Sequence, residues 1–219
     1  PNFSFVPPEV RAERLALIEE AVRKYELDGL ELDWTHSPFF FEDDESESGT
    51  PLLSEYMQEI RDAVLAATRT KTRPVALGAR VLPTLDGNLG AGLDVPSWLS
   101  EGLVDFVVPN LTGHSRQMDS DFPIEWLVEL ARSEKCDVYP ALQPRVSGPD
   151  PRFGFESGSH PADLENYWAA AAALWSKGVD GIYLPGFRWP QGPDDRRLLS
   201  ELADPDLLKE KSKHYVVRR

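Results

Sequence analysis

Two acidic residues inside an apolar segment are the part of this sequence best suited to chemistry. Residues 25–41 read YELDGLELDWTHSPFFF, in which Glu31 and Asp33 lie two positions apart and His36 follows. Because side chains alternate along a strand, Glu31 and Asp33 share one face, and the leucines beside them share the other. Neighbouring carboxylates favour one acid and one base near neutral pH. The pair therefore predicts a catalytic site, with His36 as a proton relay or as a partner of Asp33.

Arg80 is the residue expected to tune this acid pair. It ends the next predicted strand, at residues 73–83, and has the same parity as Gly78. If that face points inward, the guanidinium pairs with Glu31 or Asp33 and keeps the carboxylate ionised. The alternative is a salt bridge with a purely structural role.

Polar and aromatic side chains follow the later predicted strands, where a substrate would lie. Amide groups bind the polar groups of a substrate, and rigid aromatic faces stack on its apolar surfaces. The residues expected to bind substrate are Asn110, Gln143, Tyr183, Arg188 and Trp189. Asn110 has the alternative of a turn residue. Trp34 has the opposite parity from the acids and is expected to pack beneath helices.

Metal chemistry is the weaker alternative for this site. Glu31, Asp33 and His36 provide ligand types that bind metals, but no second histidine ends a neighbouring strand. A metal-dependent hydrolase of this kind would have several such ligands. We therefore predict neither a metal nor a cofactor.

Composition limits the partners of the chain. Its 219 residues carry a formal net charge of −14, so no general attraction to nucleic acid or anionic lipid is expected. No run of about 18 apolar residues is present, so membrane insertion is not predicted. The one cysteine, Cys136, excludes an internal disulfide.

Helical and strand patterns alternate along the whole sequence, as expected for a parallel sheet covered by helices. Predicted strands occupy residues 27–34, 73–83, 104–110, 137–144 and 179–187. Predicted helices occupy residues 8–25, 52–69, 94–102, 122–134, 161–177 and 193–203. Long polar loops are predicted at 35–50 and 144–160, each after a strand.

This α/β pattern fits either an open doubly wound sheet or a (β/α)₈ TIM barrel, and we favour the barrel. No glycine-rich phosphate loop follows a strand, which argues against a nucleotide-binding sheet. A single domain spanning 1–219 is expected, because single α/β barrels often have about 200–250 residues. Five C-terminal βα units are visible, so we expect a partial barrel from a chain truncated at both ends. The full-length chain is then expected to supply the missing N-terminal barrel strands.

The segment DGLELDW is similar to the strand-four signature D-G-x-D-x-D-W-E of chitinase-like glycoside hydrolases of family 18. The matching residues are Asp28, Gly29, Asp33 and Trp34. Glu31 replaces an Asp of the signature, and Thr35 occupies the position of the final Glu, which is the acid in that family. Threonine is no proton donor at neutral pH, so the family 18 mechanism is not carried over.

A larger part of the chain, residues 7–190, resembles uncharacterised glycosyl-hydrolase-like TIM barrels, the family-10-like glycosylhydrolases. The resemblance rests on PPEVRAERLALIEEAVRKYELDGLELDWTHSPFFF and on LGARVLPTL followed by GLDVPSWLSEGLVDFVVP. It implies a carbohydrate-active barrel, often extracytoplasmic, and it supplies no catalytic pair.

Together these observations predict a glycoside hydrolase that acts on a poly- or oligosaccharide through Glu31 and Asp33. One alternative is a glycan-binding barrel that has lost its acid, consistent with Thr35 and with Gln143 at the end of the fourth strand. The other alternative is a metal-dependent barrel hydrolase.

Overall fold

The centre of the molecule is a four-stranded parallel sheet. The computed structural model describes residues 4–41, 46–69, 71–111, 117–147, 158–187 and 190–217. The strands are β1 (Gly29–Asp33), β2 (Ala76–Val81), β3 (Phe106–Pro109) and β4 (Asp137–Val138). Their order in the sheet, β1-β2-β3-β4, is their order in the chain. Among the described residues β1 pairs only with β2, so the sheet is open at this edge.

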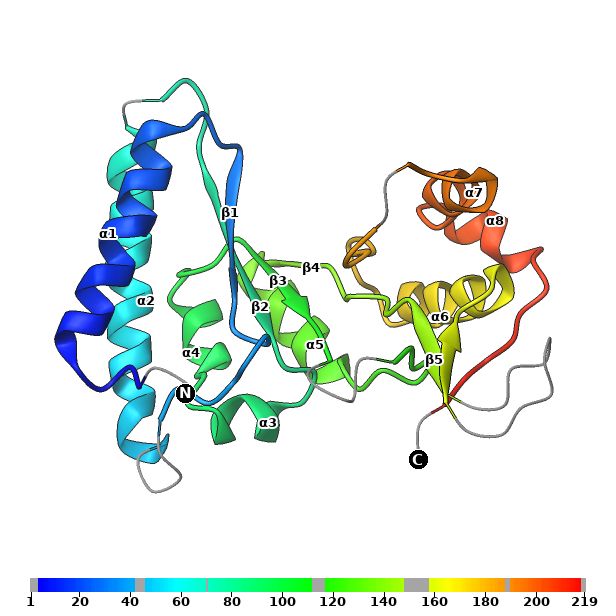
Figure 1. The fold of residues 1–219 in the computed structure, drawn as a ribbon, viewed down its shortest axis with the longest axis horizontal. Coiled ribbons are helices and arrows are strands. Elements are labelled where there is room, and N and C mark those ends of the chain that lie inside the picture. The colour runs from blue at the N-terminus through cyan, green and yellow to red at the C-terminus, as the bar shows by residue number, and fades with distance from the viewer. Residues whose placement is uncertain are drawn as a thin grey trace.

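Helices connect the strands and cover the sheet. They are α1 (Pro8–Lys24), α2 (Ser46–Thr68), α3 (Leu85–Gly90), α4 (Val95–Ser100), α5 (Glu125–Glu134), α6 (Leu164–Ser176), α7 (Pro193–Glu201) and α8 (Pro205–Lys209). Helices α1 and α2 run side by side next to β1, whereas α6, α7 and α8 form a group beyond β4 (Figure 1). Within the described part of the chain, no helix has the length and apolar character needed to cross a membrane.

Local signals set several of these helices. Asp94 caps α4 by accepting a hydrogen bond from Ser97 N at 3.2 Å, and Asp163 caps α6 by accepting one from Asn166 N at 2.9 Å. Just beyond α6, Gly178 adopts a φ of 84°, a conformation that favours glycine over residues with a side chain.

The face of the sheet that meets the helices carries the apolar side chains. Leu77, Ala79 and Val81 of β2 are fully buried and alternate with Gly78 and Arg80. Because β1 and β2 pair in parallel with Asp33 opposite Arg80, the polar residues of both strands share the other face.

Two aspartates, Asp105 and Asp180, each fasten their segment to the preceding strand. The carboxylate of Asp105 accepts from Leu77 N at 2.7 Å and receives both terminal nitrogens of Arg61 at 2.7 and 3.0 Å. In the same way, Asp180 accepts from Val138 N at 2.9 Å. These bonds use backbone donors that the strand ladder leaves free.

The fifth predicted strand is much shorter than expected. Over residues 179–187 the structure has one parallel bridge, between Ala141 and Tyr183. Leu142 N donates to the Tyr183 carbonyl at 2.9 Å, and Tyr183 N donates to the Pro140 carbonyl at 3.0 Å. Prolines interrupt both segments and cannot donate to a ladder, which limits the pairing.

The two predicted loops were wrong in part. Helix α2 begins at Ser46, so the end of the predicted loop 35–50 is helical. The segment 144–160 includes an antiparallel pair, β5 (Arg145–Ser147) and β6 (Ser159–Pro161). The short helices α3 and α8 were also not predicted. In each case the acids, serines, glycines or prolines of the segment indicate a loop, and contacts with the rest of the fold decide otherwise.

A cluster around Trp168 ties α6 to the C-terminal elements. Arg197 and Lys211 lie over the indole ring, 4.8 and 5.0 Å from its centroid. Both donate to Oε1 of Glu201, at 3.1 and 2.6 Å. Burial would raise the pKa of Glu201, but the hydrogen bonds from these two cations outweigh it and lower the pKa.

Candidate active site

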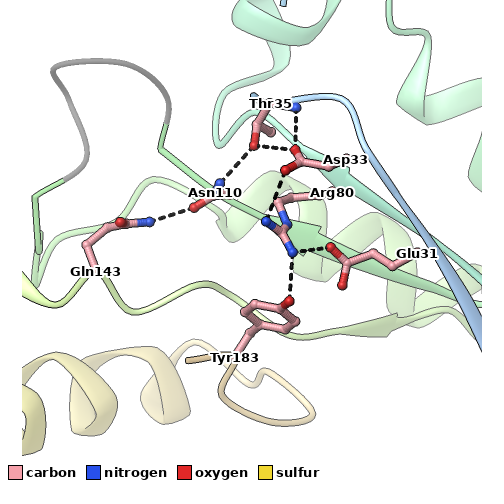
Figure 2. A network of polar contacts seen from close by, with 7 residues as sticks. All are labelled: Glu31, Asp33, Thr35, Arg80, Asn110, Gln143 and Tyr183. Atoms are coloured by element: carbon pink, nitrogen blue, oxygen red, sulfur yellow. Dashed lines mark hydrogen bonds and ion pairs between the residues drawn. The ribbon is translucent and has the colours of Figure 1, made fainter. Parts of the chain in front are cut away.

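One guanidinium binds both carboxylates of β1. Nη1 of Arg80 donates to Oδ2 of Asp33 at 3.1 Å, and Nη2 of Arg80 forms an ion pair with Oε1 of Glu31 (Figure 2). The pairing follows from strand register, because Arg80 lies directly opposite Asp33 and two residues beyond the partner of Glu31. The contact that strand parity predicts for Arg80 is therefore present in the structure.

Tyr183 completes the surroundings of the guanidinium. Nη2 of Arg80 donates to Oη of Tyr183 at 2.7 Å, and the guanidinium lies 4.9 Å from the centroid of the ring. Burial is the largest cause of a raised pKa for Tyr183, followed by the negative charge of Glu31, with Arg80 acting in the opposite direction. These contributions leave the pKa of Tyr183 above its ordinary value, so its hydroxyl keeps its proton at neutral pH.

Asp33 has more donors than Glu31. Its Oδ1 accepts from both the backbone N and Oγ1 of Thr35, each at 2.8 Å, while its Oδ2 accepts from Arg80. Glu31 forms an ion pair with Arg80. Asp33 is therefore fixed as an acceptor on both oxygens, and Glu31 has the freer carboxylate.

A buried chain of amides extends the site across the sheet. Nδ2 of Asn110 donates to Oγ1 of Thr35 at 2.8 Å, and Nε2 of Gln143 donates to Oδ1 of Asn110 at 2.6 Å (Figure 2). Thr35 is 0% exposed, and Asn110 and Gln143 are each 5% exposed. By contrast, the side chains of Glu31 and Asp33 are 21% and 35% exposed. The acids are accessible from solvent, and the amides are held inside.

Of the remaining predicted site residues, the structure describes only His36. His36 is exposed, and no bond joins it to the acids among the contacts of the described residues. Arg188 and Trp189 lie outside the described residues. In the part of the chain that the structure describes, no group of three or more acidic, histidine or cysteine side chains is arranged to hold a metal ion.

Trp34 marks the opposite face of β1, as its parity predicts. It is 5% exposed and packs against Phe5, Phe40 and Trp98, with ring centroids 5.9, 5.3 and 6.0 Å away. Phe40 is the buried member of the PFFF segment, whereas Phe39 is 64% exposed. This aromatic cluster anchors the segment that follows the acids.

Two aromatic residues on the acid-bearing face were missed from the sequence. Strand register places Phe106 beside Gly78, which is itself opposite Glu31. The Phe106 ring occupies the space where a side chain at Gly78 would be, and it lies 5.9 Å from the ring of Tyr139. The signal available was Gly78 on the same face as Arg80, since a small residue on a strand leaves room for a large neighbour.

The fold is similar to that of two solved chitinase structures and of a spore cortex-lytic enzyme. The C-terminal domain of a putative chitinase from Desulfitobacterium hafniense DCB-2 matches with a TM-score of 0.59 at 13% identity, over 93% of this chain and 74% of that one. Chitinase ChiA74 from Bacillus thuringiensis matches with a TM-score of 0.55 at 11% identity, over 90% and 47%. The spore cortex-lytic enzyme SleL from Bacillus cereus matches with a TM-score of 0.52 at 12% identity, over 93% and 57%.

At these identities the similarity shows the fold and not the activity. The chain spans about half the length of the Bacillus thuringiensis enzyme and less than two-thirds of SleL. No protein-family model matches the sequence, and no curated protein matches it either.

Proposed function

We propose that this chain forms part of a (β/α)₈ barrel that acts on a poly- or oligosaccharide as a glycoside hydrolase. The parallel sheet in chain order supports the barrel, and so does the similarity in fold to chitinases. In such barrels the chemistry lies at the carboxyl ends of the strands. Asp33 is the last residue of β1, and Glu31 lies two residues before it on the same face.

The observation that carries the proposal is the unequal bonding of two adjacent carboxylates. Glycoside hydrolysis needs one carboxyl group that exchanges a proton and a second that acts as base, nucleophile or fixed negative charge. Asp33, which accepts three hydrogen bonds, suits the fixed charge beside the positive anomeric centre. Glu31, with the freer carboxylate, suits the exchange of a proton with the glycosidic oxygen or with water.

Thr35 is not the proton donor, and this leaves Glu31 as the candidate. Its hydroxyl is fully buried between Asp33 and Asn110, so it has no access to a substrate. Arg80 pairs with the carboxylate of Glu31 and donates a hydrogen bond to Tyr183, which orients a catalytic group before the substrate binds.

The test is release of reducing sugar from a broad panel of polysaccharides. Glu31→Gln and Asp33→Asn should each lower release by about 10²–10⁴-fold, the usual contribution of a positioned acid or base. The matched control is Asp28→Asn, since Asp28 lies just before the same strand with a side chain that is 87% exposed. Full activity in Glu31→Gln would remove that residue from the mechanism.

A glycan-binding barrel without turnover is the second candidate. It is favoured by Arg80, which already binds both acids, because carboxylates that have a protein cation as partner need no substrate to pair with them. In that case the parent protein releases no sugar but still binds oligosaccharides in an affinity-gel assay. Glu31→Gln would then change binding alone.

A further inference from the structure

The amide chain beside the acids has a fixed direction of hydrogen bonding. A carboxylate only accepts, so the bond between Asp33 and Oγ1 of Thr35 must use the hydroxyl proton. The Thr35 oxygen is then left to accept, and it receives Nδ2 of Asn110. The side-chain carbonyl of Asn110 in turn accepts a hydrogen bond from Nε2 of Gln143.

Burial makes this direction costly to break. All three side chains are at most 5% exposed, so water cannot replace a lost partner. An unpaired polar group in such an environment is strongly unfavourable, and linked hydrogen bonds strengthen one another. The three residues also follow three different strand segments: Thr35 after β1, Asn110 after β3, and Gln143 after the bridge at Ala141.

We infer that Thr35, Asn110 and Gln143 form a positioning relay that fixes the Asp33 carboxylate, and that the two amides are not sugar ligands. Every donor in the relay points toward Asp33, so the carboxylate is held from one side by the relay and from the other by Arg80. Two opposed anchors fix both the position and the rotation of the group. The catalytic consequence of the relay rests on the proposed function.

Kinetic variants test the consequence for activity. Thr35→Val removes the hydroxyl at constant shape, and Asn110→Asp replaces the essential donor with an acceptor. Each should lower kcat by up to about 100-fold with KM nearly unchanged, the effect of a misplaced catalytic group. Thr35→Ser keeps the hydroxyl and should restore most of the activity lost in Thr35→Val.

Asn88→Asp is the control for the loss of a buried amide. Asn88 is 0% exposed, and its Nδ2 donates to the carbonyls of Leu82 and Thr84, at 2.8 Å each. This variant should lower the denaturation midpoint and leave kcat unchanged. If Asn110→Asp does no more than this control, the role of Asn110 is only structural and the inference is overturned.

A second measurement does not depend on activity. Denaturation midpoints are compared for Thr35→Val, Asp33→Ala and the double variant. If the relay anchors Asp33, the double variant should shift the midpoint by less than the sum of the single shifts, because both act on one contact. Additive shifts would overturn the relay, with Asp33→Asn replacing Asp33→Ala if the alanine variant does not fold. Coupled shifts in a parent without turnover would support the relay and refute the proposed hydrolase.

Discussion

Removing Arg80 is the perturbation for which the structure gives the clearest magnitude. In Arg80→Met the aliphatic stem remains, while the guanidinium that binds Glu31, Asp33 and Tyr183 is lost. Leaving a buried charge without its partner costs about 3–5 kcal/mol. Because the side chains of Glu31 and Asp33 are 21% and 35% exposed, water compensates in part, and we expect about 2–3 kcal/mol.

Urea denaturation at pH 7 measures this loss as a lower midpoint at constant slope. The matched control is Arg73→Met, since Arg73 pairs with Asp28 at 3.5 Å and their side chains are 79% and 87% exposed. Such a surface pair contributes about 0–1 kcal/mol, so the control should differ little from the parent.

Acid provides the second arm of the experiment. At pH 3 most carboxyl groups carry a proton, and the penalty for two unpaired negative charges should shrink. At pH 7, a loss of stability in Arg80→Met that is below about 1 kcal/mol, or that equals the loss in Arg73→Met, would refute the reasoning. Water alone would then stabilise the two carboxylates, and Arg80 would not be the cation on which they depend.

Three further predictions concern other parts of the molecule. Burial would raise the pKa of Glu201, but hydrogen bonds from Lys211 and Arg197 outweigh burial and lower the pKa from 4.5. The stabilising contribution of Glu201 is therefore complete above pH 4.5 and is lost as the pH falls through the lower pKa of the folded state. Glu201→Gln should flatten the acid limb of stability measured by urea denaturation, and an unchanged limb would contradict this. Asp105→Ala, which removes the partner of Arg61, should cost about 2 kcal/mol in the same assay, and a loss under about 0.5 kcal/mol would argue against it. Burial raises the pKa of Cys136 to about 12, so a thiol reagent at pH 8 should modify it only as fast as the protein unfolds; modification within the mixing time would show an accessible thiolate.

The elements that the sequence predicted well are those with local signals. The cap at Asp94, the glycine after α6 and the apolar stripe of α1 each act within a few residues, so the pattern alone indicates them. The hairpin of β5 and β6 depends on Arg145 meeting Pro161 across a long connection. Such pairing has no local signal, so the sequence predicts a loop there.

The site shows the same division. Strand parity predicted that Glu31, Asp33 and Arg80 share a face, because alternation is a property of each strand alone. It did not predict that Asn110 and Gln143 would turn toward Thr35, since that contact requires three strand ends to meet in space. The sequence predicts sugar ligands at these strand ends, and in the structure the two amides are bonded to each other and to Thr35.

The chain order of the sheet has a consequence for how the protein folds. Strands β2, β3 and β4 each pair with the strand just before them in the chain, so the loss of chain entropy is spread over successive steps. The aspartates at strand starts fit this route, because the carboxylates of Asp105 and Asp180 bind backbone groups of a strand that is already made. A nascent chain can therefore add one strand and helix at a time, and the acid pair on β1 gains its cation as soon as β2 has docked.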